Sequence, residues 1–482
     1  MFSLDLQTVL PEVILAVYAM VALMAGVYTT KDKSAGILIW ATAAMFGLVA
    51  FLIATREGTD PAFLNSFIDD GFARFSKVTI LLSAAIVLVM SQEYLARRNL
   101  LRFEYPVLVT LAVVGMMVMV SANDLMVLYM GIELQSLAMY VVASLRRDSE
   151  KSTEAGLKYF VLGALSSGLM LYGASLVYGF AGTTQFEGIF LATAIDVPLG
   201  LIFGLVFLMV GFAFKVSAAP FHMWTPDVYE GAPTPVTAFM ATAPKMAAIA
   251  LFARVVFDGF GGIVGDWQQI IAFLSVVSVF WGGIAAIGQT NIKRLMAYSS
   301  IAHMGFALMG LASGTAFGVQ AMLIYMAIYV TMNIGTFACI LCMRRADRMV
   351  EGIDDLAGLG KTHPMLALGI VVFMFSMAGI PPLGGWFAKF EVFRVLATAG
   401  EPWGYALAVV GAVNSVVALY YYASLARRMW ADDPVDGDLG PVPVTPSLMS
   451  ALTLCGVVTL VFGVVPQVVA RFTDVSLLAL GG

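Results

Sequence analysis

Four ionisable side chains stand inside long apolar runs of this 482-residue chain: Glu133, Lys215, Lys245 and Lys389. An ionisable group at the centre of a membrane costs about 3 kcal/mol or more, so such groups face a wet or paired interior. Burial favours the neutral amine of a lysine, whereas a nearby carboxylate holds the amine charged. A buried lysine with a movable carboxylate partner is therefore a proton switch, and three such lysines on separate segments predict a path for protons.

Glu133 is the carboxylate expected to pair with Lys215, and Ser136 lies on the same helix face as Glu133 at i+3. Breaking this pair would drive the proton of Lys215 towards Lys245 and then Lys389. The alternative is a static buried ion pair that only fixes the register of two helices. Three lysines are too many for one such pair.

Two histidines lie close to this predicted path. His303 follows Ser299 and Ser300 at i+4 and i+3 and suits a proton relay between lysines, because its reference pKa is near neutral. A hydrogen-bonded packing histidine is the alternative. His222 directly follows a helix break, where it either gates the uptake of protons or caps the break.

Three further basic residues have weaker functional interpretations. Lys158 begins the predicted sixth helix and is expected at the membrane interface, with tuning of Glu133 as the alternative role. Arg254 and Arg394 lie near helix ends, where a long side chain reaches the interface.

Long membrane helices must position these groups, because 60% of the residues are hydrophobic and only 12% are charged. Stretches long enough to cross about 30 Å of hydrocarbon recur along the chain. Fourteen spans are predicted, near residues 9–30, 35–55, 76–94, 104–120, 124–145, 157–180, 199–219, 233–257, 267–290, 294–313, 319–343, 364–398, 403–426 and 447–470.

The distribution of basic residues supports this count. Most of the 26 lysines and arginines fall in loops after odd-numbered helices, whereas the opposite side has Arg56, Arg74, Lys77 and Arg471. The positive-inside rule places the odd-helix loops in the cytoplasm and both termini on the far side.

Prolines interrupt the seventh and twelfth spans beside a lysine. Pro220 precedes Trp224, and the pair Pro381 and Pro382 precedes Trp386, so a Pro-x-x-x-Trp pattern recurs in the second half of the chain. The five-helix spacing between the two patterns predicts two repeats with opposite orientation in the membrane, as in transporters.

The predicted fold is thus an all-α integral membrane domain over residues 1–482, with helices 4–8 and 9–13 as inverted repeats. Its parts are three N-terminal helices (1–100), the first repeat (101–258), the second repeat (259–430), and a loop with the last helix (431–482). Pro244 in the eighth span lacks an amide hydrogen and is expected to free the carbonyl of Met240 beside Lys245, near the hydroxyls of Thr237 and Thr242.

Cofactor chemistry finds no support in the sequence. Cys339, Cys342 and Cys455 all lie in apolar runs and supply neither a disulfide scaffold nor a four-thiolate cluster. The chain has no phosphate-binding loop, dinucleotide fingerprint or basic nucleic-acid surface. We expect neither a metal nor a cofactor in this chain.

The segments 215–234, KVSAAPFHMWTPDVYEGAPT, and 291–303, NIKRLMAYSSIAH, resemble the antiporter-like membrane subunits of respiratory complex I and the related multisubunit cation/proton antiporters. The resemblance covers most of the chain and is strongest to the subunit N group. Glu133, Lys215 and Lys245 match the family's buried residues on helices five, seven and eight. Lys389 matches the lysine of the subunit N group on the second broken helix, where subunit M has a glutamate.

This resemblance implies that NADH, FMN, iron–sulfur clusters and quinone are handled by other subunits while this chain pumps protons in response. It also implies a bacterial inner membrane, and as partners lipids and other membrane subunits of complex I, including subunit M and the small subunit K, with no nucleic acid. Two alternatives remain: a subunit of a sodium/proton antiporter, and a structural scaffold whose buried ions serve specificity alone.

Overall fold

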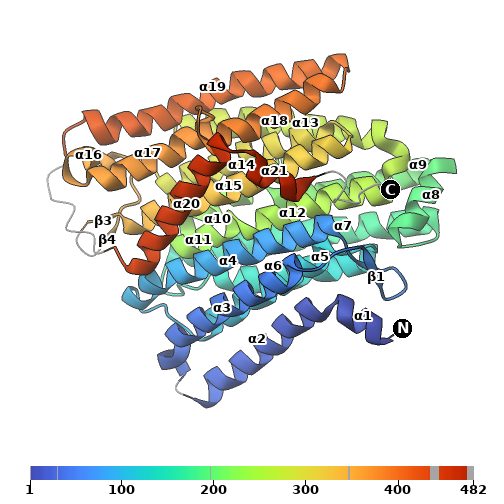
Figure 1. Ribbon diagram of the computed structural model, residues 1–482, viewed down its shortest axis with the longest axis horizontal. Coiled ribbons are helices and arrows are strands. Elements are labelled where there is room, and N and C mark those ends of the chain that lie inside the picture. Colours follow the sequence, from blue (N-terminus) through green and yellow to red (C-terminus); the bar gives the residue numbers. More distant parts are fainter. Residues whose placement is uncertain (1, 30, 196, 346–347, 435–443, 475–482) are drawn as a thin grey trace.

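The computed structural model describes residues 2–29, 31–195, 197–345, 348–434 and 444–474 as a bundle of roughly parallel helices. α2 lies on one face of the bundle and α19 on the opposite face (Figure 1). Two short antiparallel strand pairs occur in the loops: β1 (Asp60–Ala62) with β2 (Phe67–Asp69), and β3 (Arg344–Arg345) with β4 (Arg348–Met349).

The first half of the chain contains twelve α-helices within its described residues. They are α1 (Phe2–Thr8), α2 (Leu10–Tyr28), α3 (Ala35–Ala54), α4 (Gly71–Arg97), α5 (Glu104–Val120), α6 (Leu125–Ala143), α7 (Glu150–Ala181), α8 (Phe186–Ile195), α9 (Leu199–Val216), α10 (Trp224–Gly231), α11 (Thr234–Met240) and α12 (Ala243–Arg254). A π-helical turn, Val255–Gly259, extends α12.

The second half contains nine more α-helices in the part that the structure describes. They are α13 (Val264–Ile287), α14 (Ile292–Ala312), α15 (Ala316–Cys342), α16 (Leu359–Thr362), α17 (Pro364–Ala378), α18 (Gly384–Thr398), α19 (Pro402–Ala431), α20 (Pro446–Val464) and α21 (Gln467–Ala470). Short 3-10 turns are Lys31–Ser34, Gly261–Ile263, Asp354–Leu356 and Arg471–Thr473. The predicted loop 431–446 falls largely on residues 435–443, which lie outside the described residues.

Twelve segments among the described residues are long and apolar enough to cross a membrane. Two shorter apolar helices, Glu104–Val120 and Pro364–Ala378, occupy the fourth predicted span and the first part of the twelfth. The all-α membrane fold is therefore confirmed, while the count of fourteen crossings stays a prediction.

The two predicted helix breaks are confirmed. α9 ends at Val216 and α10 begins at Trp224, while α17 ends at Ala378 and α18 begins at Gly384. A proline inside each gap removes an amide donor and prevents the helix from continuing. The peptide bonds before Pro220 and Pro382 are both cis.

The eighth span has a further break that we did not predict. The expected helix 233–257 is divided into α11 and α12 by Ala241 and Thr242. Pro244 lies in the first turn of α12, a position where its missing amide hydrogen breaks no helical hydrogen bond. Pro244 therefore starts a second helix instead of opening a gap within one.

Equivalent hydrogen bonds recur in the two halves of the chain at one constant interval in sequence number, which we call the repeat offset. Asp124 caps α6 through the amides of Met126 and Val127, and Asn291, one repeat offset later, caps α14 through those of Lys293 and Arg294. The flanking backbone bonds match as well, from Leu125 to Thr184 and Phe186 to Asn123 in the first half, and from Ile292 to Glu351 and Ile353 to Thr290 in the second.

These matched caps lie at opposite ends of the bundle, since α6 begins near β1 and α14 begins near β4 (Figure 1). Gly115 packs against the backbone of Gly131 and Gln135, and Gly282, one repeat offset later, packs in the same way against Tyr298 and Ala302. A Cβ at either glycine would clash with backbone. The shared pattern supports two repeats of opposite orientation.

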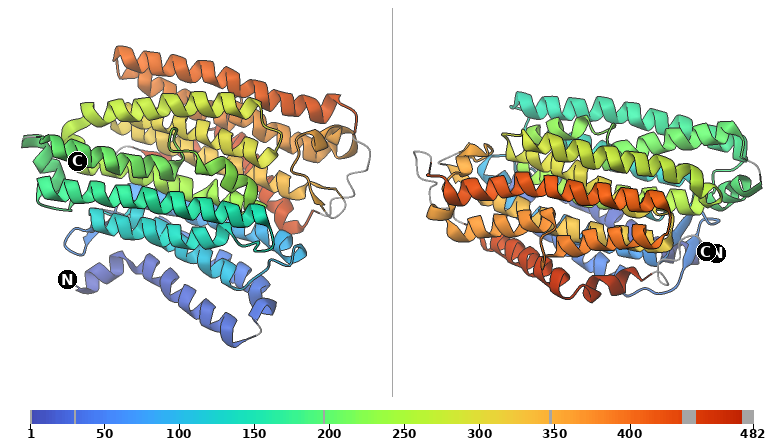
Figure 2. Two further views of the ribbon diagram at one scale, coloured as in Figure 1. Left: turned by 180° about the vertical axis from the view of Figure 1, so that it is seen from behind. Right: turned by 90° about the horizontal axis from the view of Figure 1, so that it is seen from above.

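The centre of the bundle is formed by the segment Thr234–Gly259 together with α14 and α15. Every residue in the apolar window of Thr234–Gly259 is buried, and nearly all of those in α14 and α15 are. The outer helices α2, α7, α19 and α20 instead expose many apolar side chains, and Figure 2 shows them at the edges of the bundle. The predicted proton-carrying residues thus lie on the central helices and on the broken helices beside them.

Candidate functional site: a line of buried lysines and hydroxyls

Lys215 lies one residue before the end of α9 and is 8% exposed. Its Nζ donates a hydrogen bond to Ser136 Oγ at 2.6 Å. Glu133 lies close enough to act electrostatically on Lys215, but none of the described ion pairs joins the two. Oε1 of Glu133 is buried without a hydrogen-bond partner among the described residues. The expected pair is therefore separated, with Ser136 taking the place of the carboxylate.

The break after α9 brings two further groups close to Lys245. Ser217 has a left-handed backbone with φ 63°, unusual for a residue other than glycine. Its Oγ accepts hydrogen bonds from Lys245 Nζ and, at 2.7 Å, from Thr225 Oγ1. The ring of Trp224 lies 5.0 Å from Lys245 Nζ. The broken seventh helix thus surrounds Lys245 with a hydroxyl and an aromatic face.

Lys245 is 1% exposed and lies in the first turn of α12. The hydroxyls predicted to lie near it have other partners: Thr242 donates to the carbonyls of Ala238 and Phe239, and Thr237 donates to that of Tyr229. The acceptor of Lys245 is instead Ser217. The sequence alone does not show that Ser217, at the break of the preceding helix, contacts Lys245.

His303 is 3% exposed in the middle of α14, and tyrosines surround it. Its Nδ1 lies 2.6 Å from Tyr325 Oη, and its Nε2 lies 3.4 Å from Tyr422 Oη. Tyr422 Oη also lies 2.5 Å from Ser299 Oγ. Both ring nitrogens thus contact hydroxyls, an arrangement that fits a relay and also a hydrogen-bonded packing histidine.

Lys389 lies in the second turn of α18 and is 4% exposed. Its Nζ donates to the carbonyl of Ala378 at 2.8 Å and lies 4.7 Å from the ring of Phe306. Ala378 ends α17, so the break between α17 and α18 makes this carbonyl available. Lys389 is close enough to His303 to interact with it electrostatically.

The other two candidates lie away from this line. His222 is half-buried, its Nδ1 has no hydrogen-bond partner among the described residues, and its ring lies 5.8 Å from that of Trp281. Lys158 forms ion pairs at 2.7 Å with Glu154 and Asp227. Its partners favour the interfacial interpretation of Lys158 over tuning of Glu133.

Asp227 and Glu230 of α10 belong to an ion-pair cluster at the end of the bundle where α7 and α14 begin. Asp227 pairs with Lys158 and Arg294, and Glu230 pairs with Lys151 and Arg294. Burial alone would raise the pKa of both carboxyls, but the hydrogen bonds and charges of these partners outweigh it and lower the pKa of each. We call these five residues the α10 clamp.

The structure corrects the positions that the sequence analysis expected for three basic residues. Arg254 does not reach an interface: it is 1% exposed and forms a two-pronged ion pair with Asp70, at 2.7 and 2.9 Å. Lys77, counted among the basic residues of the opposite side, is buried in α4 and pairs with Glu12 at 2.7 Å. Lys293, assigned to a loop, is buried in α14 and donates to the carbonyl of Ala232 at 3.2 Å.

Several buried hydroxyls on this line were missed in the sequence: Ser217, Thr225, Tyr229, Tyr325, Tyr329 and Tyr422. Ser217 and the tyrosines of the later helices stand in or beside apolar runs, where such residues are typical of packing, whereas Thr225 and Tyr229 stand in a polar segment that was not predicted to be a helix. One sequence pattern could have revealed two of these tyrosines. Tyr325, Tyr329 and Asn333 are spaced at i, i+4 and i+8, which places them on one face of α15.

The three cysteines are buried and free. Within the described ranges, no group of three or more His, Cys, Asp or Glu residues lies together in an arrangement that could hold a metal ion. The side chains on the line described above are amines, hydroxyls and an imidazole, which support hydrogen bonding and proton exchange.

The comparisons with known proteins agree with this architecture. Residues 122–415 match the family described as NADH:quinone oxidoreductase/Mrp antiporter, transmembrane. A chain of respiratory complex I from Thermus thermophilus with bound aureothin superposes with a TM-score of 0.81 at 32% identity, covering 96% of this chain and 98% of that one. The fold and the line of buried lysines define an antiporter-like membrane subunit.

The relatives in sequence are more specific. NADH-quinone oxidoreductase subunit N from Jannaschia sp. (strain CCS1) is 61% identical over 94% of this chain and 95% of the relative. Subunit N from Rhodobacter capsulatus is 57% identical over 95% and 96%. The chain belongs to the subunit N branch of the NADH:quinone oxidoreductase/Mrp antiporter family.

A chain of the Mrp complex from Dietzia sp. DQ12-45-1b also superposes, with a TM-score of 0.84 over 100% of this chain and 98% of that one. Its sequence identity is 19%, so this likeness shows the shared fold alone.

Proposed function

We propose that this chain is the proton-translocating subunit N of a bacterial NADH-quinone oxidoreductase, and that protons move through Lys215, Lys245, His303 and Lys389. Electron transfer from NADH to quinone takes place in other subunits, and this subunit moves protons in response. The observation that carries the proposal is Lys245: an amine 1% exposed at the centre of the bundle, with a neutral serine as its hydrogen-bonding partner.

Glu133 acts as the switch of this path. Its carboxylate is near Lys215, Oε1 has no hydrogen-bond partner among the described residues, and Lys215 donates to Ser136. If the carboxylate moves onto the amine, the charged form of Lys215 is favoured, and if it moves away, the proton is released towards Lys245. The separated pair fits the state in which Lys215 has lost its carboxylate partner.

The orientation and neighbours of the chain follow from this assignment. We place the odd-helix loops in the cytoplasm and both termini in the periplasm, because most lysines and arginines lie in those loops. The exposed apolar faces of the outer helices would contact lipids and other membrane subunits, among them subunit M and the small subunit K.

Lys245→Ala tests the proposal in membranes that contain the assembled complex. We expect NADH-driven proton pumping and coupled quinone reduction to fall at least about tenfold, since a buried proton carrier is lost. Lys361→Ala is the matched control, because Lys361 is half exposed and pairs with the exposed Asp433. Unchanged pumping in Lys245→Ala, with normal assembly, would support the scaffold alternative, and a requirement for sodium would support antiport.

A further inference from the structure

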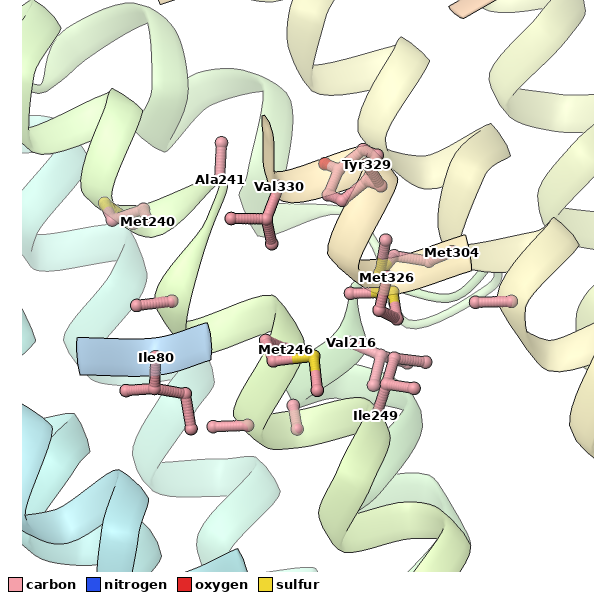
Figure 3. Close-up of a cluster of buried hydrophobic side chains, with 14 of the residues drawn as sticks. Ile80, Val216, Met240, Ala241, Met246, Ile249, Met304, Met326, Tyr329 and Val330 are labelled. Atoms are coloured by element: carbon pink, nitrogen blue, oxygen red, sulfur yellow. The ribbon is translucent and has the colours of Figure 1, made fainter. Parts of the chain in front are cut away.

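A wall of buried apolar side chains lies where α12 meets α14 and α15. Figure 3 shows Met246 and Ile249 of α12 facing Met304 and Met326 of α14 and α15, with Val216 beside them. Each of these five side chains is fully buried. Methionine sulfur is only a weak acceptor and none of these side chains has an exchangeable hydrogen, so the wall is a poor path for a proton. Because Met246 directly follows Lys245 and Met304 directly follows His303 in the sequence, this contact offers no polar route from one residue to the other.

A polar route passes around this wall through α10. Ser217 accepts a hydrogen bond from Lys245 and another from Thr225, the second residue of α10. Tyr229 follows Thr225 at i+4, on the same face of α10 and one turn further along. The buried face of α10 thus leads from the surroundings of Lys245 towards the second repeat.

Tyr229 ends this route. Its side chain is fully buried, and by ordinary hydrogen-bond geometry its hydroxyl has no partner among the described residues. α10 packs against α14, and the hydroxyl lies close enough to Ser300 of α14 and Tyr329 of α15 to interact with both. The Tyr329 hydroxyl donates to Ser300 Oγ at 2.7 Å, and the Tyr329 ring lies 5.2 Å from that of His303. A buried hydroxyl without a partner is costly, so its position at this junction calls for a reason.

We propose that Tyr229 is a proton-carrying residue that links the two repeats, receiving a proton from the side of Lys245, Ser217 and Thr225 and passing one to Ser300, Tyr329 and His303. A hydroxyl relays a proton by accepting one on an oxygen lone pair while its own proton leaves on the other side, so Tyr229 is unchanged after each hop. Its hydroxyl turns between the two sides. This inference rests on the proposed function.

The repeat register gives Ser300 a special place in this route. Ser300 lies one repeat offset after Glu133, and His303 lies one repeat offset after Ser136, at equivalent positions of the helices capped by Asp124 and Asn291. The first repeat therefore places a carboxylate where the second places the serine that faces Tyr229. A neutral hydroxyl transmits a proton at this position without trapping its charge.

Tyr229→Phe tests the role of the hydroxyl, since it removes one oxygen and keeps the packed ring. We expect coupled NADH:quinone turnover and proton pumping to fall at least about tenfold. The solvent deuterium isotope effect on turnover should rise, because proton transfer becomes rate-limiting. Tyr105→Phe is the matched control: Tyr105 is also fully buried, and its hydroxyl also lacks a partner among the described residues, but it lies on α5 away from the route.

Ser300→Ala provides a second variant on the same route. It should slow turnover, and combining it with Tyr229→Phe should slow turnover no further than the stronger single substitution, because both interrupt one path. Fully additive losses in the double variant would contradict a shared path.

Lys245→Ala, measured in parallel, separates this inference from the proposed function. Normal turnover and isotope effect in Tyr229→Phe, with loss of pumping in Lys245→Ala, would overturn the role of Tyr229 alone. Equal slowing in Tyr229→Phe and Tyr105→Phe would reduce the effect to packing and also overturn that role. Normal pumping in Lys245→Ala would remove the proposed function and this inference with it.

Discussion

The bond from Lys215 to Ser136 defines the resting state of the first buried amine. Ser136 is neutral, so it accepts a hydrogen bond from Lys215 without fixing its charge, whereas Glu133 would fix it. The same serine hydroxyl donates to the carbonyl of Ile132 at 2.6 Å, which holds it in position on α6. In the proposed switch, Ser136 would hold the amine of Lys215 while the carboxylate of Glu133 is away from it.

Ser136→Ala would remove this acceptor and leave the amine of Lys215 without it. Hydrogen bonds to charged groups contribute about 1.5–3 kcal/mol, so we expect turnover to fall about tenfold or more. Ser136→Thr keeps a hydroxyl at the same place and should retain most of the activity. The check is NADH-driven pumping in membranes with equal amounts of assembled complex, and equal rates in the alanine and threonine variants would contradict this role.

Sequence reasoning at the residue scale identified the ionisable groups and missed most of their partners. Glu133, Lys215, Lys245 and Lys389 were recognisable because a charge in an apolar run is costly and therefore informative. Ser217 was not, because a serine beside an apolar run costs little and is common in packed helices, and Tyr229 was not, because it stands in a polar segment outside the predicted helices. Only the geometry of the breaks shows that Ser217 contacts Lys245.

At the scale of elements, the short helix α10 depends on its ends. Trp224 and Thr225 at its beginning lie beside Lys245 and its partner Ser217, whereas Asp227 in its first turn and Glu230 near its end belong to the α10 clamp. A helix of 8 residues is too short to be stable by itself. The clamp, together with packing, must therefore keep α10 in place.

Asp227→Asn would weaken the clamp from the side of α10. Partly exposed ion pairs contribute about 1 kcal/mol or less each, so we expect faster amide exchange in residues 224–231 and a turnover reduced about twofold to fivefold. Glu154→Gln is the matched control, because Glu154 pairs with the same Lys158 but lies on α7. Hydrogen exchange on the assembled complex measures the first effect. Equal loosening of α10 in both variants would refute the clamp.

Acidification should act on the clamp in the same direction. Because the folded protein lowers the pKa of Asp227 and Glu230, their contribution to stability is present above the ordinary carboxyl pKa and is lost as pH falls through the lower folded values. The clamp is therefore intact at neutral pH.

Some of the helix breaks could be predicted from the sequence and one could not. The gaps at Pro220 and at Pro381 and Pro382 were predictable, because a proline in the interior of a helix removes a hydrogen bond and clashes with the preceding turn. The gap at Ala241 and Thr242 was not, because neither residue disfavours helix and Pro244 is compatible with a first helical turn. Tertiary packing decides such a case.

At the scale of the whole molecule, one buried ion pair fastens the N-terminal helices to the first repeat. Arg254 of α12 binds Asp70, which also caps α4 through the amide of Ala73. Arg254 Nε donates in addition to the carbonyl of Val120 at 2.8 Å. Sequence reasoning placed Arg254 at an interface because its partner lies 184 positions away in the chain.

Arg254→Leu would leave Asp70 as an unpaired buried charge. Such a loss costs about 3–5 kcal/mol, so we expect much less assembled subunit in the membrane and a lower melting temperature. Replacing Asp70 by Asn in the same variant should restore part of the lost abundance and melting temperature. Arg394→Leu is the control, because Arg394 pairs with Glu391 at a largely exposed site. Equal abundance of the Arg254 and Arg394 variants would show that the buried pair does not fasten the helices.

The limits of the repeats, at residues 101–258 and 259–430, stay predictions, although the bonds that recur at the repeat offset support them. The repeat was detectable from one Pro-x-x-x-Trp pattern, while the matched caps Asp124 and Asn291 were not, since their residue types differ. Geometry preserves a repeat after the side chains have diverged.

The buried groups also determine where the membrane voltage can act. Lys245 and His303 lie near the middle of their segments, Thr234–Gly259 and Ile292–Ala312, and Lys215 lies beside the break of its own. If protons move between these groups as proposed, the steps run across the helices, nearly perpendicular to the electric field, and would do almost no electrical work. The work of about 2.3 kcal/mol per charge at 100 mV then falls on uptake from one side and release to the other. The membrane voltage would therefore act on proton uptake and proton release, and would hardly affect the transfer steps between the buried groups.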